Sequence, residues 1–308
     1  MKAFKLSRLS SLLATALCGA ALTAPAHGAD ALKIGMSFQE LNNPYLVAMK
    51  TSLEAAAAKL GAELIITDAR HDVAKQISDV EDLVQRGVDI LLLNPTDSVG
   101  VQSAVLTAHE AGVVVVAVDA QAQGPLDAFV GSKNYDAGYQ ACKYLAEHVG
   151  GKGEIAILDG IPVVPILERK RGCEAAVDEF EGLAVVARQN GKQQRDTALS
   201  VTENLLQAHP RLAGIFSVND TGAMGALTAI EASGLDVRLV SVDGTPEAIT
   251  AMQQPGSKFI ATSAQFPRDM VLLGLGVGLA RHWGAKVPAA IPVDVALIDK
   301  EKAASFSW

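Results

Sequence analysis

Residues 94–119 read NPTDSVGVQSAVLTAHEAGVVVVAVD, and residues 219–243 read NDTGAMGALTAIEASGLDVRLVSVD. Each stretch follows an apolar run and begins with Asn. It continues through a helix-like segment that closes on Gly and ends in a β-branched run followed by Asp. Chance alternation could produce the strands, but hardly the same polar residue types at both strand ends. The repeat predicts two similar α/β domains.

The rest of the sequence continues this alternation of strands and helices. Strands that are apolar on both faces and separated by helices indicate parallel sheets covered on both sides, so we expect two doubly wound parallel-sheet domains. The expected strands are 32–37, 63–67, 89–93, 113–118, 154–158, 183–188, 212–217 and 238–242. The expected helices are 44–61, 74–86, 98–111, 167–180, 197–208 and 221–233.

Residues 1–26 have the pattern of a secretory signal peptide. Three basic residues precede the apolar run 9–22, which is too short for a membrane-spanning helix, and a small-x-small cleavage site ends at Ala26. Cleavage after Gly28 is an alternative. Removal of this leader changes the formal charge from −8 to −11. We expect the mature protein in the periplasm.

The composition excludes several classes of protein. The chain has 308 residues, 49% hydrophobic and 19% charged, which is too apolar for a disordered chain. Its acidic balance argues against nucleic acid or an anionic membrane as a partner. Two cysteines of the mature chain, Cys142 and Cys173, each have bulky neighbours along the chain. We expect two buried free thiols, with a disulfide as the alternative.

Sequence motifs for catalysis, metal binding and phosphate binding are missing. The chain contains no G-x-S-x-G, H-E-x-x-H, C-x-x-C or Walker-type glycine loop. Gly274, Gly276 and Gly278 are spaced like a dinucleotide fingerprint, but they lie in a helical stretch that follows no strand, so they indicate close helix packing. We therefore expect a protein without enzymatic activity, metal or cofactor.

Polar residues at the expected strand ends indicate a ligand site. In open parallel sheets, ligands bind beyond the carboxyl ends of the strands. Asn94 and Asp119 occupy such ends in one half, and Asn219 and Asp243 in the other. We expect Asp119 and Asp243 to contact a ligand in a shared cleft. For Asn94 and Asp220 we expect turn or helix capping, the commonest role of Asn and Asp at strand ends.

Several short blocks, in one order, carry a family resemblance. They are LNNPY (41–45), LLLNPTDS (91–98), AVDAQ (117–121), ERKRG (168–172), NLLQAHP (204–210), VNDTGAMGAL (218–227), SVDGTP (241–246) and AQFP (264–267). Together they resemble the ribose-binding type of periplasmic sugar-binding proteins, the solute-binding subunits of bacterial ABC importers. Repressors of the lactose and ribose type share the core domains, but they carry a helix-turn-helix where this chain has a leader.

The resemblance implies a type I periplasmic binding protein fold, with two domains joined by a three-segment hinge. One domain would comprise 27–131 and 266–293, and the other 132–265 and 294–308. The ligand would be a neutral sugar or polyol, delivered by a monomer to an ABC permease in the inner membrane; the resemblance also allows a chemoreceptor as a partner. The implied ligand-binding residues are Ser37, Asn43, Tyr45, Asp119, Arg169, Asn219, Asp243 and Gln265.

Departures from the ribose-binding pattern leave the ligand open. Ala120 stands where that pattern has Arg, and Leu46, Gln193 and Val242 stand where it has aromatic residues that enclose the sugar ring. These changes argue against ribose itself, while a cyclitol, an acyclic polyol and a hexose remain candidates. An amine- or amino-acid-like ligand is an alternative, and a secreted hydrolase with paired carboxylates is a third.

Overall fold

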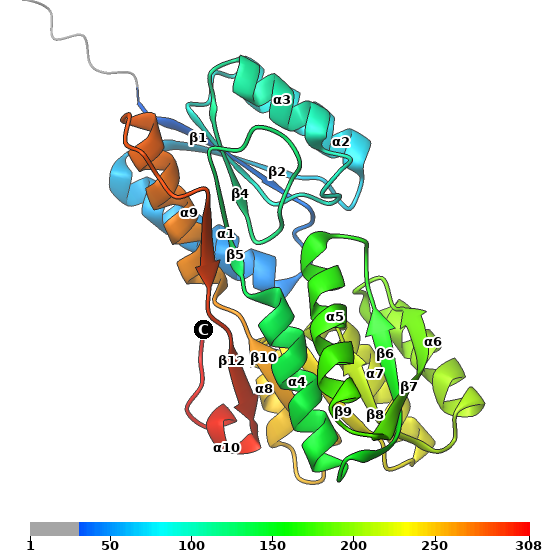
Figure 1. Ribbon diagram of the computed structural model, residues 1–308. Helices are drawn as coiled ribbons and strands as arrows, with labels where there is room; N and C mark the ends of the chain where they lie inside the picture. The colour runs from blue at the N-terminus through cyan, green and yellow to red at the C-terminus, as the bar shows by residue number, and fades with distance from the viewer. Residues whose placement is uncertain (1–30) are drawn as a thin grey trace, which may run out of the picture. The chain divides into compact units, whose positions relative to one another are not determined.

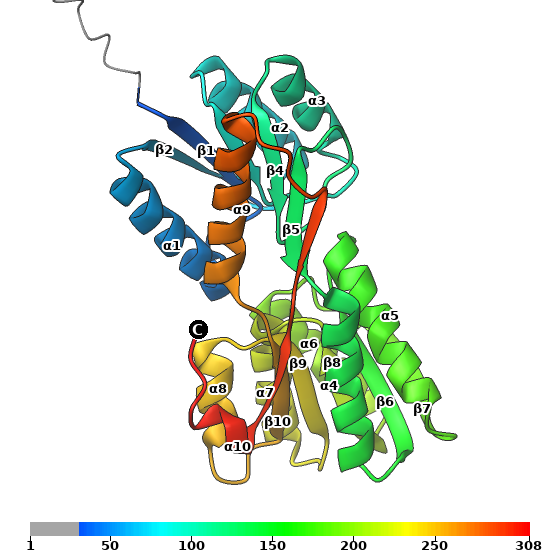
Figure 2. The same ribbon diagram turned by 60° about the vertical axis from the view of Figure 1, so that its left-hand side comes forward.

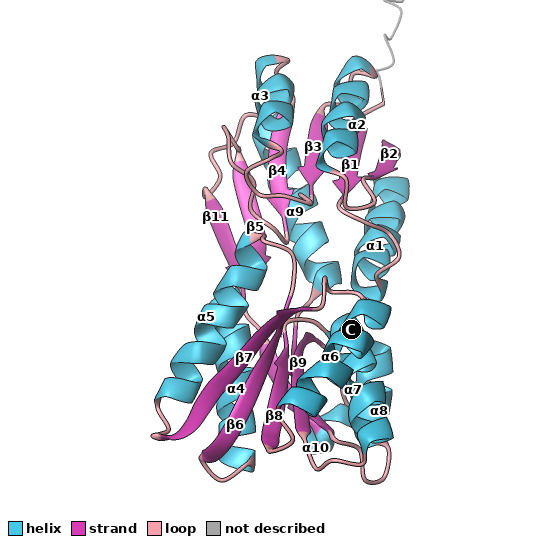
Figure 3. Ribbon diagram, turned by 90° about the vertical axis from the view of Figure 1, so that its right-hand side faces the viewer, coloured by secondary structure: helices cyan, strands magenta, loops and turns pink. Residues whose placement is uncertain are grey.

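The computed structural model describes residues 31–308. The predicted signal peptide lies outside the described residues. Within them, no helix is both long and apolar enough to cross a membrane. Two six-stranded sheets, each flanked by helices, make up this part of the chain (Figure 1; Figure 3).

The first sheet has the strand order β11-β5-β4-β3-β1-β2, and all its strand pairs are parallel. Its strands are β1 (Lys33–Phe38), β2 (Glu63–Asp68), β3 (Ile90–Leu93), β4 (Val114–Val118), β5 (Ala128–Ser132) and β11 (Ala290–Val293). Helices α1 (Pro44–Leu60) and α9 (Pro267–His282) pack on one face, and α2 (Val73–Gln85) and α3 (Gln102–Glu110) pack on the other.

The second sheet repeats this plan with the order β12-β10-β9-β8-β6-β7. Its strands are β6 (Lys152–Asp159), β7 (Gly182–Asn190), β8 (Leu212–Ser217), β9 (Arg238–Asp243), β10 (Phe259–Ala264) and β12 (Ala296–Asp299). Helices α4 (Asn134–His148) and α5 (Val164–Asp178) cover one face, and α6 (Arg195–Ala208), α7 (Asp220–Ser233) and α8 (Pro246–Gln253) cover the other. The predicted pair of doubly wound domains is confirmed, although the edge strand β12 runs antiparallel to β10.

The chain passes between the two sheets three times, after β5, after β10 and after β11 (Figure 2). Two of these crossing segments run together, since the Lys133 backbone N–H donates to the Val293 carbonyl at 2.9 Å. The sheet membership of the strands agrees with a three-segment hinge. The residue boundaries given above for the two domains stay a prediction.

Capping side chains begin three of the six expected helices, those of α1, α2 and α7. Asn43 accepts a hydrogen bond from the Tyr45 backbone N–H, and Gly61 ends α1 at φ 65°, as expected. The helix expected at 98–111 begins only at Gln102 because the Asp97 carboxylate accepts from the N–H groups of Val99 and Gly100, which closes a turn instead.

The glycines of α9 let this helix approach the first sheet closely. An added Cβ at Gly274 would lie 2.8 Å from Val118, and one at Gly278 would lie 2.8 Å from Ile90. The interpretation of these glycines as packing residues is therefore confirmed, although Gly276 faces open space.

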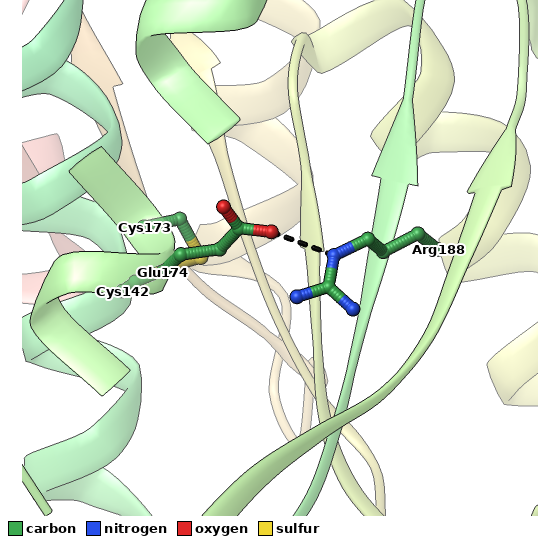
Figure 4. Close-up of a disulfide and its surroundings, with 4 residues drawn as sticks. All are labelled: Cys142, Cys173, Glu174 and Arg188. Atoms are coloured by element: carbon green, nitrogen blue, oxygen red, sulfur yellow. Dashed lines mark hydrogen bonds and ion pairs between the residues drawn. A yellow bond between two sulfur atoms is a disulfide. The ribbon is translucent and has the colours of Figure 1, made fainter. Parts of the chain in front are cut away.

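A disulfide joins Cys142 of α4 to Cys173 of α5, so the expectation of two free thiols is wrong (Figure 4). The two helices approach closely because Gly138 faces the Arg169 backbone and Gly172 faces the Tyr135 backbone. This brings the two cysteine Cα atoms within 4.9 Å of each other, a separation that a disulfide needs. The cysteines pair because the two helices pack closely at these glycines. The residues next to each cysteine in the sequence do not indicate this contact.

Removal of this disulfide should destabilise the protein. The bond closes a loop with a sequence separation of 31, for which constraint of the unfolded chain predicts a loss of about 3–4 kcal/mol in the double variant Cys142→Ser/Cys173→Ser. Urea unfolding measures this loss. Dithiothreitol should lower the melting temperature of the parent protein and leave the variant unchanged. Two titratable thiols in the denatured, unreduced parent protein would contradict the bond.

Candidate functional site

A small cavity lies where the carboxyl ends of the two sheets approach each other, with a volume of about 30 Å³. Side chains from both halves of the chain line it. Six of the eight predicted ligand-binding residues are among them: Asn43, Tyr45, Asp119, Arg169, Asp243 and Gln265. The remaining lining residues are Gln39, Leu46, Ala120, Val163, Pro165, Ile166 and Gln193.

Asp119 follows β4 and is held by two side chains of the first half. Its Oδ1 accepts from the Tyr45 hydroxyl at 2.9 Å, and its Oδ2 accepts from Asn94 Nδ2 at 3.1 Å. Burial raises the pKa of Asp119, an effect that the Arg169 charge opposes. Burial also raises the pKa of Tyr45, which keeps this hydroxyl protonated as a donor.

Asn94 does not cap a turn, so that expectation is wrong. Its side chain connects three strand ends instead: Oδ1 accepts from the Gln39 backbone N–H, and Nδ2 donates to Asp119 and to the Val118 carbonyl. Asn94 is fully buried at the end of β3, which lies between the parallel strands β1 and β4, so the ends of both neighbouring strands supply its partners. It thus helps to hold Asp119 in place.

Asp243 follows β9 and is the equivalent carboxylate of the second half. Its Oδ1 accepts from Gln265 Nε2 at 2.8 Å and from Arg169 Nη1 at 3.3 Å. Burial raises the pKa of Asp243 to about 7; the Arg169 charge opposes this, and the nearby Asp220 adds to it. Burial therefore favours the protonated form of Asp243 far more than for an exposed Asp.

Arg169 of α5 is 4% exposed and supplies the one guanidinium of the site. Its Nη1 also donates to the Val218 carbonyl at 2.8 Å, and its Nε donates to Asn134 Oδ1 at 2.8 Å. These bonds fix the guanidinium beside Asp243. With two carboxylates and one guanidinium, the fully ionised cavity carries net negative charge and disfavours anionic ligands.

Two amide oxygens of the cavity are buried without a protein partner among residues 31–308: Oε1 of Gln39 and Oε1 of Gln265. A buried acceptor without a partner is costly, so both oxygens suit the O–H groups of a ligand. Gln39 was missed from the sequence. It comes directly after β1, at the sheet edge that also carries Asp119, and this position was the signal that could have identified it.

Ser37 and Asn219 do not line the cavity, and their assignment as ligand-binding residues stays a prediction. Ser37 Oγ accepts from Gln76 Nε2 at 3.2 Å inside the first half. Asn219 caps α7, since its Oδ1 accepts from the Gly222 N–H at 3.0 Å, while its Nδ2 donates to the Gln193 carbonyl.

Asp220 does not act as a cap of α7, contrary to expectation. Its carboxylate lies fully buried and accepts from the Thr245 N–H at 2.7 Å, from the Thr262 hydroxyl at 2.8 Å and from the Ser241 hydroxyl. Asn219, one residue earlier, already occupies the capping position. Asp220 therefore joins the ends of β9, β10 and α8 behind Asp243.

A second, larger cavity of about 380 Å³ adjoins the first, and both share Asn43 and Gln193 as lining residues. Its walls are mainly polar and come from both halves of the chain; they include Glu40 of the first half and the ion pair of Arg195 with Glu247 in the second. Gln193 thus stands at the junction of the two cavities, where the ribose-binding pattern has an aromatic ring. Its Oε1 accepts from the Ile161 N–H at 3.2 Å.

The chain is similar to known binding proteins over most of its length. Residues 34–277 match the family model described as periplasmic binding protein domain. The chain is 42% identical over 236 residues, 76% of each protein, to the ribose import binding protein of Bacillus subtilis. A solute-binding protein from Actinobacillus succinogenes with bound D-allose has a similar structure (TM-score 0.84, 31% identity, 89% of this chain and 100% of that one). So has a Caulobacter myo-inositol binding protein bound to myo-inositol (TM-score 0.84, 27% identity, 90% and 96%).

The raised pKa of Asp243 predicts a pH-dependent stability of the ligand-free protein. Because this pKa is about 7 in the folded state against an ordinary 3.8, the folded protein binds more protons between these values. The free energy of unfolding contributed by Asp243 therefore falls as pH rises from about 4 to about 7. Asp119 and Asp220 act in the same direction, so Asp243→Asn should reduce this decline rather than abolish it.

Urea unfolding at pH 5 and pH 8 measures the effect. The stability of Asp243→Asn relative to the parent protein should be higher at pH 8 than at pH 5. Asp178→Asn, at an exposed position near the end of α5, is the matched control and should show no such change. An equal difference at both pH values for Asp243→Asn would contradict the raised pKa.

Proposed function

Because the chain belongs to the periplasmic binding protein family, we propose that it captures a neutral sugar, cyclitol or polyol between its two halves and delivers it to an ABC permease. The observation that carries the proposal is the buried set of hydrogen-bonding groups around the small cavity. Asp119, Asp243 and Arg169 are each less than a tenth exposed, and two amide oxygens beside them have no partner in the described chain.

Polyhydroxylated ligands match this set of groups. Each hydroxyl both donates and accepts, so it can donate to a carboxylate or amide oxygen and accept from a guanidinium or amide N–H. A hydroxyl that is buried without a partner costs about 1–3 kcal/mol, so a site of this kind rejects analogues whose hydroxyls are misplaced. The ligands named for the relatives, ribose, D-allose and myo-inositol, are all neutral polyols of this kind.

The side chains around the cavity favour a ligand other than a flat, ring-stacked pentose. Tyr45 and Leu46 contribute one aromatic and one aliphatic wall from α1, and Val163 and Ile166 contribute aliphatic walls from α5. Gln193 replaces a stacking surface with an amide at the junction to the larger cavity. A cyclitol or hexose gains from such a site because it has more hydroxyls than a pentose to pair with these polar groups.

Neither other candidate class has similar support. An amine could pair with Asp119 or Asp243, but the ligands named for the relatives described above are sugars and a cyclitol rather than amines. A hydrolase would have to use these same two carboxylates, and the relatives described above are named as binding proteins.

Family membership also supports action in the periplasm after removal of residues 1–26. The protein would act there as a monomer that opens and closes about the three crossing segments. A membrane permease would receive the ligand from the closed form.

A thermal-shift screen tests the proposed ligand class. The panel contains D-ribose, D-allose, D-glucose, myo-inositol and xylitol, with glycine, glutamate and putrescine as the amine arm. A ligand at a hundred times its Kd adds about 2.7 kcal/mol to the free energy of unfolding, so at least one polyol should raise the melting temperature by several degrees. Stabilisation by an amine and by no polyol would overturn the proposal, and turnover of a bound polyol would favour the hydrolase.

The two carboxylates should each contribute strongly to ligand affinity. Asp119→Asn and Asp243→Asn preserve side-chain shape but remove an ionised acceptor; because a hydrogen bond to a charged group contributes about 1.5–3 kcal/mol, each change should weaken binding at least about tenfold. Isothermal titration calorimetry with the polyol that gives the largest thermal shift measures this effect. Asp178→Asn should bind normally, and normal affinity in both site variants would mean that the carboxylates only order the strand ends.

A further inference from the structure

Residues 304–308, the segment that follows α10 (Lys300–Ala303), carry two aromatic residues back toward the small cavity. In Figure 2 this segment rises from α10 past α8, and the point marked C lies below α1. Phe306 packs against Phe266, with ring centroids 6.4 Å apart and ring planes 62° apart. Phe266 directly precedes α9, where the chain crosses between the sheets, so Phe306 anchors the segment at a crossing point.

Trp308 contacts both halves of the molecule. Its indole Nε1 donates to the backbone carbonyl of Asp243 at 3.2 Å, at the end of β9 in the second sheet. Its ring meets the Tyr45 ring edge to face, with centroids 5.9 Å apart and planes 74° apart, on α1 beside the first sheet. The half-buried Trp308 also packs against the hydrophobic core that α1 and α9 form on the first sheet.

On the second sheet, Trp308 donates a hydrogen bond to a backbone segment that has an unusual positive φ angle. Asp243 has φ 135°, in the region that favours glycine, and its carbonyl accepts from the Gln265 N–H at 3.0 Å as well as from Trp308. Gly244 follows, and an added Cβ there would lie 3.2 Å from the Phe306 ring. The segment 304–308 therefore packs directly against the turn that aims the Asp243 carboxylate.

On the first sheet, Trp308 supports the donor that orients the other carboxylate. Tyr45 donates to Asp119 Oδ1 at 2.9 Å, and its hydroxyl lies 3.8 Å from Met270 Sδ. The edge-to-face contact with Trp308 limits how the Tyr45 ring can turn. Trp308 thus acts on each ligand-binding carboxylate indirectly. It contacts the backbone of Asp243, and it contacts the Tyr45 phenol that donates to Asp119.

We propose that Trp308 is a positioning residue that joins the two halves of the closed site and sets the geometry of Asp119 and Asp243 together. The proposal rests on the function proposed above. Because Trp308 contacts opposite sides of the cleft, its contact with Tyr45 is broken when the halves separate and forms again when they close. Its main effect is therefore on how long a captured polyol is retained.

The chain provides its own optical probe for this arrangement. It contains two tryptophans, and the other, Trp283, is 71% exposed at the end of α9. Trp283→Phe leaves Trp308 as the single tryptophan without altering the site. In this background, saturation with the polyol selected by the thermal-shift screen should shift the emission of Trp308 to shorter wavelength and reduce its quenching by acrylamide.

A measurement at saturating polyol tests the contact itself, because the contact forms when the halves close. Adding Tyr45→Ala to the Trp283→Phe background should raise the acrylamide quenching constant of Trp308 in the saturated protein, because the Trp308 ring loses its contact with the Tyr45 ring. Tyr144→Ala is the matched control, since Tyr144 stacks on His148 within α4, and it should leave the quenching unchanged. Equal quenching in the two variants at saturating polyol would overturn the proposal.

Stopped-flow and calorimetric binding test the positioning role. Trp308→Ala should weaken polyol affinity at least tenfold, mainly through faster dissociation. Trp308→Phe keeps an aromatic edge for Tyr45 but loses the bond to Asp243, and it should recover part of this loss. Trp283→Ala should bind like the parent protein.

The outcomes separate this proposal from the function on which it rests. If the parent protein binds a polyol and Trp308→Ala binds it with the same affinity and dissociation rate, the positioning role is wrong and the proposed function stands. If no polyol stabilises the parent protein, the proposed function fails, and with it the role of Trp308 in polyol retention. An unchanged Trp308 emission in a protein that demonstrably binds its ligand would also overturn the positioning role.

Discussion

Burial of two carboxylates beside one guanidinium is the constraint that organises the ligand site. Asp119 and Asp243 lose hydration on folding, and burial raises the pKa of both, so neither is well solvated by the protein alone. The surrounding hydrogen bonds offset part of this cost: Tyr45 and Asn94 donate to Asp119, and Gln265 and Arg169 donate to Asp243. A ligand with several hydroxyls can supply the remaining donors, so the unfavourable burial becomes a source of selectivity.

Parallel-sheet topology explains why such a cluster can exist. Every strand that precedes a helix ends at the same edge of its sheet, so polar residues that follow β1 and β4 in one half, and β8 and β9 in the other, meet without long loops. Supporting residues lie behind them in the same way. Asn94, at the end of β3, forms hydrogen bonds with residues at the ends of β1 and β4. Asp220 forms hydrogen bonds with residues of β9, β10 and the start of α8. These bonds hold the surroundings of each carboxylate in place.

The sequence predicted the elements with the clearest periodicity and the repeat between the halves, whereas β5, β10, α4 and α8 were not among the expected elements. The strand and helix alternation, the caps of α1 and the two strand-end acids follow from local patterns and from the repeat between the halves. Contacts between residues far apart in the sequence depend on tertiary packing and could not be predicted from these patterns. The Cys142–Cys173 bond needed two glycines on facing helices, and the role of Asn94 needed its burial between neighbouring strands. Trp308 follows a four-residue helix without any periodic pattern, so nothing along the chain connects it to Tyr45.

The same electrostatics would couple the proposed ligand capture to protonation. Burial raises the pKa of Asp243 to about 7, so its protonated form is favoured far more than that of an exposed Asp. If the proposed ligand donates a hydroxyl to this group, it favours the carboxylate, and binding is then expected to lower this pKa. Both acids already have donors on both oxygens: Tyr45 and Asn94 on Asp119, and Gln265, Arg169 and the Asp220 backbone N–H on Asp243. They differ in the charges beside them, because burial alone raises the pKa of Asp119, whereas the Asp220 carboxylate adds to the effect of burial at Asp243. Asp243 is therefore the acid whose protonation the proposed ligand would change more.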